Sequence, residues 1–321
     1  MRAISPSSTP RARSWLAIFA GSFGLILLIL AGLIFALRDQ LPPPKFSGNI
    51  AFNEKIRWAR AKLQAQECDT LVLGSSIALN NVDAQSLESA SGHKVMNLGT
   101  WGLEIAGSAK LFDALVNVCT PKRVILPVYY GDFAFSPEAA IPDAPILTNY
   151  LQSKSSSAIL HYLHHGDLFG LWKNYRALKR YRSVGPTNYQ HLVFDPLGSA
   201  LLACEGFKID AQRWNGFEKR TVHIEPEALK AFDAFLERAQ SLGINVTVAE
   251  TPMRAQANDA LQVSLHKWHE ALAKMAAKRG ALFLPPPSDF DDALFADYTH
   301  LNSCGAQAWT RLIAQQAKLI P

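Results

Sequence analysis

Short apolar runs and amphipathic segments alternate along most of this chain. We predict the apolar runs as strands, and we predict helices where apolar residues recur three or four positions apart. The predicted strands are Thr70–Leu73, Lys94–Leu98, Arg123–Tyr129, Asn245–Ala249 and Ala281–Leu284. The predicted helices are Asn53–Gln66, Ile105–Val118, Glu227–Ser241, Val263–Arg279 and Gly305–Leu319. Strands that alternate with helices indicate an α/β fold, in which helices cover both faces of a parallel sheet.

The alternation is interrupted between about Phe133 and Thr221. This stretch is rich in aromatic and basic residues, among them Trp172, Tyr175, Arg176, Tyr181, Arg182 and Trp214. We predict that it forms a helical and irregular insertion over one end of the sheet. The chain shows no internal repeat and no second linker rich in Gly or Ser. We therefore predict one domain over residues 50–321, with an insertion at about 133–221.

The N-terminal region contains an uncharged apolar stretch, Trp15–Leu37. Roughly 20 apolar residues in a helix cross the hydrocarbon core of a bilayer. Polar residues do not recur at helical spacing along this stretch, so that a core helix of a soluble domain is not indicated. The alternative is a cleaved signal peptide, which has a shorter apolar core and a small-x-small cleavage site. Ile34–Leu37 offers no clean site of that kind. We predict an uncleaved transmembrane signal-anchor over residues 15–37.

Charges around this stretch predict its orientation. Arg2, Arg11 and Arg13 precede it, and basic residues stay on the cytoplasmic side of a membrane. Residues 1–14 are therefore predicted as a cytoplasmic tail, with the globular domain on the periplasmic (extracytoplasmic) side of the inner membrane. Leu41–Pro44 favours an extended polyproline form, so that residues 38–49 are predicted as a Pro-rich linker.

Composition excludes several classes of protein. The chain has 321 residues, of which 49% are hydrophobic and 18% charged. It is too apolar for a disordered protein, and its four Cys are too few for a disulfide miniprotein. The net charge of +5 comes from 32 Lys and Arg against 27 Asp and Glu, and no basic run of the nucleic-acid-binding kind stands out. Nucleic acid is therefore not an expected partner.

Candidate chemistry follows the strands, because ligands bind beyond the carboxyl ends of the strands in such sheets. The segments that follow the predicted strands are Gly74–Ser76, Asn97–Gly102, Tyr130–Asp132, Thr251–Arg254 and Asp297–Asn302. Each has an ordinary structural explanation, since Ser caps helices, Gly allows turns, Asp297 can cap the last helix and a lone His is often a surface residue. Together they supply a hydroxyl, a His three residues after an Asp, and Gly-containing turns. Nucleophilic acyl transfer needs these groups: a nucleophile, a base, an acid that orients the base, and backbone donors for an oxyanion.

In these segments the chain resembles the SGNH (GDSL-like) hydrolase superfamily. The resemblance covers Thr70–Tyr130 and Val246–Gly305 and implies a flavodoxin-like three-layer α/β/α fold with strand order 2-1-3-4-5. It implies Ser76 as the nucleophile, Asp297 and His300 as the other two members of a triad, and backbone N–H groups of Ser76 and Gly102 as oxyanion donors, with Asn97 opening the second block. Within the superfamily, the chain is most similar to membrane-anchored envelope proteins of polysaccharide O-acetylation or lipoteichoic acid D-alanylation.

The chain departs from the family pattern in two places. Ser75 replaces the Asp of Gly-Asp-Ser, which is not the triad acid. The Gly-x-Asn of the third block is absent, and Tyr129–Asp132 stands in its place. Three explanations are open: the backbone donors suffice, a Tyr hydroxyl substitutes for the Asn, or activity is reduced or lost.

Two further residues are predicted to bind substrate. Arg254 follows the fourth strand and is expected at the same edge, where a guanidinium can bind an anionic substrate or polarise an acyl carbonyl; the alternative is a solvated loop Arg. Tyr130, which follows the third strand, is the second residue predicted to bind substrate. The pairs His164–His165 and His266/His269 lack Cys or carboxylate partners at ligand spacing, so no metal and no cofactor is predicted.

The predicted function is a membrane-tethered serine esterase or O-acyl(acetyl)transferase that acts on a cell-envelope glycan through an acyl-serine. The alternative is a catalytically silent glycan-binding or scaffold subunit of the same modification system, with the aromatic insertion as a sugar platform. Expected partners are an envelope polysaccharide or other glycan, a membrane-bound protein that donates the acyl group, and the membrane itself through one helix.

The four cysteines are predicted to form two disulfides, because an extracytoplasmic domain lies where disulfides persist. In the implied strand order, Cys68 and Cys119 precede neighbouring strands at the same end of the sheet. Cys204 of the insertion is then paired with Cys304, four residues after His300. The alternative is that all four are free buried thiols.

Overall fold

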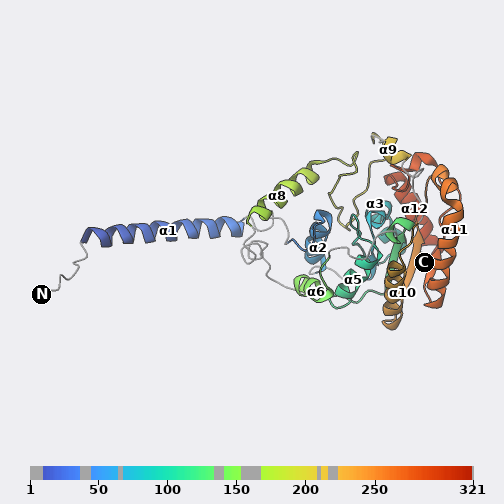
Figure 1. Cartoon of the computed structure of the whole chain (residues 1–321), viewed down its shortest axis with the longest axis horizontal. Helices are drawn as coiled ribbons and strands as arrows, with labels where there is room; N and C mark the ends of the chain where they lie inside the picture. The colour runs from blue at the N-terminus through green and yellow to red at the C-terminus, as the bar shows by residue number, and fades with distance from the viewer. Residues whose placement is uncertain are drawn as a thin grey trace.

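A computed structural model describes residues 10–36, 45–63, 68–133, 141–152, 168–207, 211–215 and 223–319 of the chain. Beyond α1 at the N-terminus, these residues form a globular part built on one parallel sheet (Figure 1). Its strands are β1 (Thr70–Val72), β2 (Val95–Asn97), β3 (Arg123–Val128), β4 (Asn245–Glu250) and β5 (Leu282–Leu284).

All neighbouring strands of the sheet are parallel, and their order is β2-β1-β3-β4-β5. This is the predicted flavodoxin-like order, in which the chain runs outward from β1 in both directions. The carboxyl ends of β1, β3 and β4 therefore meet near the centre of the sheet, and this position brings the segments that follow them together.

Alternate residues of each strand enter two separate cores, as the two-residue period of a strand requires. Leu71, Leu126 and Val248 belong to the first core, whereas Val72 and Ile125 belong to the second. The first core is closed by α2 (Ile50–Leu63), α5 (Ile105–Leu115), α10 (Pro226–Ser241) and α11 (Ala255–Lys278). The second is closed by α3 (Ser76–Asn81), α4 (Ala84–Ser91) and α12 (Ser303–Gln316). The result is the predicted three-layer α/β/α arrangement.

Most predicted elements agree with the structure to within a few residues. The largest difference is α11, which begins at Ala255, eight residues before the predicted start at Val263. The short helices α3 and α4 were not predicted as elements. The Ser75 hydroxyl caps α3, and the Asp83 carboxylate caps α4, whose other end is the left-handed Gly92. Such short helices span only about two turns or fewer, so that apolar spacing marks them weakly and caps are their main sequence signal.

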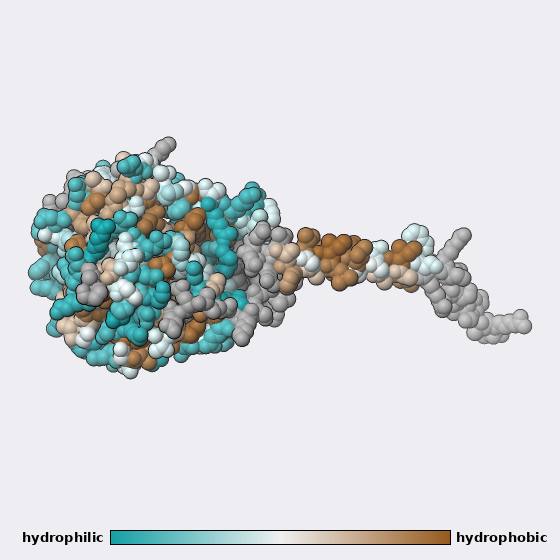
Figure 2. All heavy atoms as spheres, turned by 180° about the vertical axis from the view of Figure 1, so that it is seen from behind, coloured by the Kyte–Doolittle hydropathy of each residue, from teal (hydrophilic) through white to brown (hydrophobic). Residues whose placement is uncertain are grey.

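The first helix, α1 (Pro10–Ala36), stands clear of the globular part (Figure 1), and apolar residues make up most of the face that Figure 2 shows. Its segment Ser14–Leu33 is long and apolar enough to cross a membrane, and none of it is buried. Leu37, the end of the predicted anchor, and Leu41–Pro44 of the predicted linker lie outside the described residues.

The described part of the predicted insertion contains α6 (Ala144–Gln152), α8 (Leu168–Ser183) and α9 (Ala211–Trp214). The short 3-10 helices η1 (Tyr130–Phe133) and η3 (Asp292–Leu294) lie at its start and beside the last loop. Helix α6 packs on α5 and α2, and α8 packs on α2. The insertion is thus attached to α2 and α5, two of the helices that close the first core.

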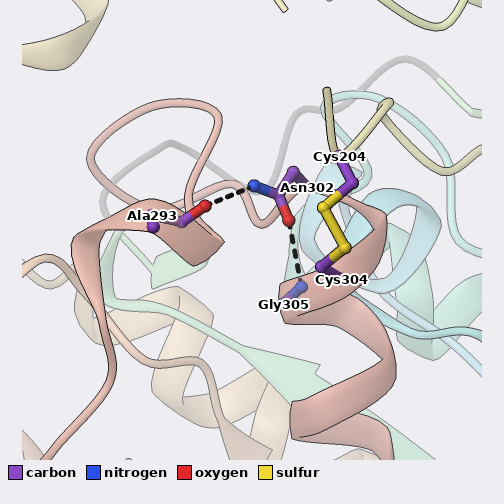
Figure 3. Close-up of a disulfide and its surroundings, with 5 residues drawn as sticks. All are labelled: Cys204, Ala293, Asn302, Cys304 and Gly305. Carbon is purple, nitrogen blue, oxygen red and sulfur yellow. Dashed lines mark hydrogen bonds between the residues drawn. A yellow bond between two sulfur atoms is a disulfide. The ribbon is translucent and has the colours of Figure 1, made fainter. Parts of the chain in front are cut away.

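Both predicted disulfides are present. Cys68 and Cys119 join the loops that enter β1 and β3, with 6.2 Å between their Cα atoms. Cys204 joins the insertion to Cys304 in the first turn of α12, with a Cα–Cα distance of 5.4 Å (Figure 3). Next to this second bridge, the Asn302 side chain donates to Ala293 O and accepts from Gly305 N. The bridge therefore fastens the insertion to the start of α12.

Candidate active site

The turn from β1 into α3 places Ser76 at the carboxyl edge of the sheet. Gly74 has a φ of +143°, and a Cβ there would lie 3.0 Å from Pro127 O on the neighbouring strand. This turn therefore requires glycine. The Ser75 hydroxyl caps α3 by accepting from Ile77 N at 3.3 Å, and Ser76 is the first residue of that helix.

Asp297, His300 and Ser76 form one hydrogen-bonded chain. His300 Nδ1 lies 2.8 Å from Asp297 Oδ2, and His300 Nε2 lies 2.8 Å from Ser76 Oγ. With its proton on Nδ1, the ring donates to the carboxylate while Nε2 accepts from the Ser76 hydroxyl. Nucleophilic serine sites need this arrangement of nucleophile, base and orienting acid. The structure thus brings together the three residues that the sequence singled out.

Asp297 is built to remain ionised. Burial of this carboxyl opposes ionisation, but the positive charge that His300 can carry and the hydrogen bonds it receives hold its pKa below the ordinary value. Two of these bonds come from the backbone of its own loop, from Thr299 N at 2.9 Å and His300 N at 2.7 Å to Oδ1. An ionised acid at this position fixes the tautomer of the His and stabilises its protonated form.

Asn81, at the end of α3, positions the catalytic loop. Its side chain is fully buried, donates to Thr299 O at 2.8 Å and to Thr251 Oγ1 at 2.8 Å, and accepts from Leu301 N at 2.9 Å. Asn81 was not among the residues predicted from the sequence. Its signal in the sequence is faint, because an Asn five residues after a candidate nucleophile resembles an ordinary helix end.

The loop that follows β2 carries Gly102 and is anchored from several sides. The Asn97 side chain donates to Ala78 O at 2.7 Å and accepts from Gly99 N at 2.9 Å. Lys55, fully buried, donates to Asn97 O at 3.1 Å. Burial lowers the pKa of Lys55 well below its ordinary value. Gly102 itself lies in an exposed turn with φ +61°, a conformation that favours glycine.

A pocket of about 320 Å³ lies over Ser76 and His300. This is the lower end of the range for small-molecule sites. The other residues that line it are Asn80, Trp101, Tyr181, Tyr189, Gln190 and Arg213. Four of these come from the insertion, which therefore supplies most of the walls around the candidate nucleophile.

Aromatic contacts hold these walls together. The Trp101 and Tyr181 rings meet edge to face at 5.6 Å between centroids. The Tyr189 ring lies 6.5 Å from that of His300, and its hydroxyl donates to Ala296 O beside the catalytic loop. The pocket thus has apolar faces on its sides and polar groups at its floor.

Arg213 is the one cation among the described residues that line this pocket, and it was not predicted from the sequence. Its guanidinium lies 4.1 Å from the centre of the Tyr189 ring, and Nη1 lies 3.8 Å from Asp297 Oδ2. About half of its side chain is exposed. No strand or motif marks Arg213 in the sequence, because it lies on the short helix α9 inside the insertion.

The structure corrects the substrate-binding role predicted for Arg254. Its side chain is buried, stacks 3.6 Å from the centre of the Trp214 ring, and donates to Trp214 O and to Asp292 Oδ2 at 2.8 and 2.9 Å. It does not line the pocket over Ser76. Arg254 follows β4 as expected, but Trp214 of the insertion covers its guanidinium, and Trp214 and Asp292 accept hydrogen bonds from its two terminal nitrogens.

Tyr130 is also placed differently from the prediction. It is 2% exposed and belongs to the first core, beside Tyr129. A residue in that position shapes the edge of the sheet from inside and does not line the pocket over Ser76.

The Tyr129 side chain lies directly against Gly131. A Cβ on Gly131 would collide with the phenol ring of Tyr129, including its hydroxyl oxygen. Position 131 must therefore be glycine while Tyr129 keeps this rotamer. The aromatic ring occupies the space into which a side chain from residue 131 would extend, at the end of the strand next to β1.

A buried carboxyl lies beneath the nucleophile turn. Asp132 Oδ2 accepts from Tyr129 N at 3.1 Å. Burial raises the pKa of Asp132 to about 7, against the opposing effect of hydrogen bonds from Ser75 and Tyr129. Asp132 thus connects the loops that follow β1 and β3.

Among the described residues, no group of three or more His, Cys, Asp or Glu side chains is arranged to hold a metal ion. His269 instead pairs with Glu250 at 2.9 Å, and His266 pairs with Glu270 at 3.3 Å. His164–His165 lie outside the described residues.

No family model matches this chain, and no curated protein matches it. Among solved structures it is similar to a protein assigned to the G-D-S-L family of lipolytic proteins from Desulfitobacterium hafniense, with 14% identity over 78% of this chain and 99% of the other, at a TM-score of 0.40. A protein assigned as an acylhydrolase from Bacteroides fragilis matches with 14% identity, coverage of 82% and 96%, and a TM-score of 0.44. An acetyl xylan esterase from the rumen bacterium Butyrivibrio proteoclasticus matches with 10% identity, coverage of 79% and 65%, and a TM-score of 0.34. All three TM-scores are below 0.5.

Proposed function

We propose that this protein is a serine esterase or O-acyltransferase of the SGNH type. The observation that carries the proposal is the hydrogen-bonded chain Ser76–His300–Asp297 at the floor of a pocket. A Ser–His hydrogen bond alone occurs on many surfaces. Here the His is also oriented by a buried, ionised Asp, and its loop is held on both sides by Asn81.

The proposed reaction proceeds through an acyl-serine. Ser76 Oγ attacks the ester carbonyl while its proton passes to His300 Nε2, and a tetrahedral intermediate forms. Backbone N–H groups of Ser76 and Gly102 are proposed to stabilise its oxyanion. The carbon–oxygen bond of the ester then breaks, and the leaving alcohol takes the proton from His300. Water or a second hydroxyl resolves the acyl-Ser76 by the same steps in reverse order, which yields hydrolysis or transfer respectively.

We further propose that the Tyr129 hydroxyl takes the place of the absent Asn. Residues 72 and 125 are partners in the sheet, so that Tyr129 follows β3 about as far along as Ser76 follows β1. Its ring also fills the space in front of Gly131. A phenol hydroxyl is a hydrogen-bond donor, which is the property that the third oxyanion position needs.

The proposed substrate is an acylated glycan of the cell envelope. Three aromatic side chains, Trp101, Tyr181 and Tyr189, line the pocket, and flat aromatic faces pack well against the apolar faces of sugar rings. Arg213 adds a half-exposed guanidinium, which favours an acidic sugar.

The proposed location is an extracytoplasmic membrane surface. Helix α1 has the length and apolar character of a single membrane-spanning segment. Two disulfides in the globular part support an oxidising compartment, because thiols stay reduced in the cytosol. A membrane-bound protein is the proposed source of the acyl group if transfer occurs.

The experiment is a turnover assay of the full-length protein with p-nitrophenyl acetate and with acetylated oligosaccharides, followed by acetate release and sugar mass. We expect turnover that Ser76→Ala and His300→Ala each lower by about 10³-fold or more. Ser75→Ala is the matched control, since it removes a neighbouring hydroxyl that caps α3 without removing the nucleophile. Equal rates for Ser76→Ala and the parent would contradict the proposal.

The second candidate is a catalytically silent glycan-binding or scaffold subunit. Gly131 favours it, because the family's third-block donor is missing at that site. This candidate predicts that the parent binds the same oligosaccharides without turnover, and that Ser76→Ala leaves their affinity unchanged.

A further inference from the structure

Helix α8 (Leu168–Ser183) has an unusual charge composition. It contains five basic side chains, Lys173, Arg176, Lys179, Arg180 and Arg182, and no acidic one. The chain has 32 Lys and Arg residues, so that the 27 outside α8 equal the 27 Asp and Glu residues in number. The formal excess of positive charge therefore corresponds to this one helix.

The first half of α8 also exposes aromatic side chains. Phe169 is 72% exposed, Trp172 53% and Tyr175 44%. The Phe169 and Trp172 rings lie 5.8 Å apart, and the Arg176 guanidinium lies 4.9 Å from the centre of the Trp172 ring. These side chains follow one another at helical spacing, which gathers aromatic rings and positive charge in one region of the surface.

The second half of α8 is fixed to the globular part. Leu178 is buried in a small cluster with Ala51 and Leu192, and the Arg182 guanidinium bonds Glu54 on α2. Tyr181 enters the wall of the candidate active site. The exposed first half therefore extends from a firmly packed second half.

Along the long axis of the molecule, α8 lies at the end of the globular part that faces α1, and its first residues are nearest to α1 (Figure 1). Helix α1 runs along the same axis. A membrane crossed by α1 would lie perpendicular to this axis. The start of α8 would then face the membrane surface. Helix α11, by contrast, lies at the far end.

We propose that the first half of α8, together with the exposed basic side chains of Arg176, Lys179 and Arg180 that follow it, binds the headgroup region of the same bilayer that α1 spans, and that it prefers anionic phospholipids. This inference rests on the membrane tether in the proposed function. Trp and Tyr rings partition to the membrane interface, and clusters of Lys and Arg near a membrane are attracted to anionic lipid headgroups. Charge, aromatic character and position along the axis agree on this occupant.

The contact has a consequence for the active site. Trp172 and Tyr181 lie nine residues apart on one helix, which is about 14 Å at the usual helical rise. Membrane binding by the first half of α8 therefore holds the pocket at a short, fixed distance from the headgroups. It suits a substrate or acyl donor that is presented at the membrane surface.

The test is hydroxyl-radical footprinting of the purified full-length protein in nanodiscs of phosphatidylcholine, with and without phosphatidylglycerol. The measured quantity is the oxidation rate of Trp172 and Tyr175. We expect slower oxidation in the anionic nanodiscs, and we expect the double variant Lys173→Gln/Lys179→Gln to restore the rate about threefold or more. The matched control is Lys267→Gln/Lys274→Gln, which removes two exposed charges from α11 at the far end; it should leave the rate unchanged.

Three results would overturn the inference. One is equal oxidation of Trp172 and Tyr175 in neutral and anionic nanodiscs, and a second is an equal effect of the α8 and α11 variants. A third is protection that needs a second protein, which would make α8 a protein-docking helix. Failure of the tether is distinguishable, because the full-length protein would then be released from the nanodiscs and the α8 rates would not depend on lipid at all.

Discussion

The side chain of Asn81 holds His300 by the backbone on either side of it. Its amide nitrogen donates to Thr299 O, and its amide oxygen accepts from Leu301 N. Asn81 ends the helix that Ser76 begins. The nucleophile and its base, 224 residues apart in sequence, are therefore held by one short rigid helix.

Asn81→Asp is expected to lower kcat/KM by about 10- to 100-fold with a small change in KM, because a loss of position near 1 Å at the base is enough for such an effect. The variant keeps the shape of the side chain but loses the donor to Thr299 O. A purely structural role would lower the melting temperature alone. A positioning role also shifts the acid limb of the pH profile of kcat/KM, and an unchanged profile would contradict it.

Tyr129→Phe is expected to lower kcat by about 10- to 1,000-fold, the range for the loss of one oxyanion donor. Phe keeps the ring in front of Gly131, so that the fold and KM should change little. The companion variant Gly131→Asn places an amide donor where the ring now stands, and we expect it to destabilise the protein unless Tyr129 is also made small. Parent-level kcat in Tyr129→Phe would leave the two backbone N–H groups as the oxyanion donors.

Arg213→Ala is expected to raise KM about tenfold for an acetylated oligosaccharide of acidic sugars, the size of effect of one charge-assisted hydrogen bond. KM for an acetylated neutral oligosaccharide should stay close to the parent value. Arg254→Ala is the comparison: it should lower the melting temperature, since Trp214 and Asp292 lose their partner, without selecting between the two substrates. If Arg254→Ala, and not Arg213→Ala, raised KM for the acidic oligosaccharide alone, Arg254 would be the substrate-binding residue and Arg213 the structural one.

Removal of each disulfide is expected to cost about 2–5 kcal/mol of stability, but only one should affect catalysis. Cys204→Ala/Cys304→Ala frees the loop that contains Leu202. Leu202 O accepts a hydrogen bond at 2.6 Å from Ser303 N, and Ser303 lies three residues after His300. Cys68→Ala/Cys119→Ala acts at the opposite edge of the sheet. Unfolding measurements give the loss of stability, and turnover measured well below the melting temperatures of both variants gives the loss of catalysis. Equal losses of turnover in the two variants would contradict the prediction.

Stability is expected to fall as the pH rises from about 4 to about 7. The pKa of Asp132 is raised to about 7 by burial, whereas an Asp in the unfolded chain releases its proton near pH 4. In this interval the native state therefore binds the extra proton, and its contribution is lost as the pH rises through the native pKa. Burial also raises the pKa of Glu250 to about 7, so that the stability contributed by protonated Glu250 is lost over the same rise in pH.

Asp132→Asn should reduce this dependence, because Asn keeps an acceptor and cannot ionise. The melting temperature of the variant should fall less between pH 5 and pH 8 than that of the parent. Asp289→Asn, at an exposed position, is the matched control. Asp297 changes stability with pH in the opposite direction. Because its pKa is lowered in the native state, the stability that it contributes is lost only in more acidic solution.

Much of the fold was predictable because its determinants are local. Alternation within β3 and β4 and apolar spacing in α5 and α10 are properties of neighbouring residues. Asp297 and His300 are three residues apart, so that one loop delivers both. Cys68 and Cys119 precede neighbouring strands, and the strand order alone brings them into bridging distance.

The sequence by itself thus determined the layers, the edge of the sheet at which Ser76 and His300 meet, and the disulfides. Only the tertiary structure decided which cation enters the pocket, because Arg213 and Arg254 were distinguished by how the insertion packs and not by their neighbours in sequence. It also showed Tyr129 in front of Gly131 and Asn81 behind His300. The physical reason is that such contacts depend on side-chain packing between distant segments, and this packing leaves no periodic trace along the chain.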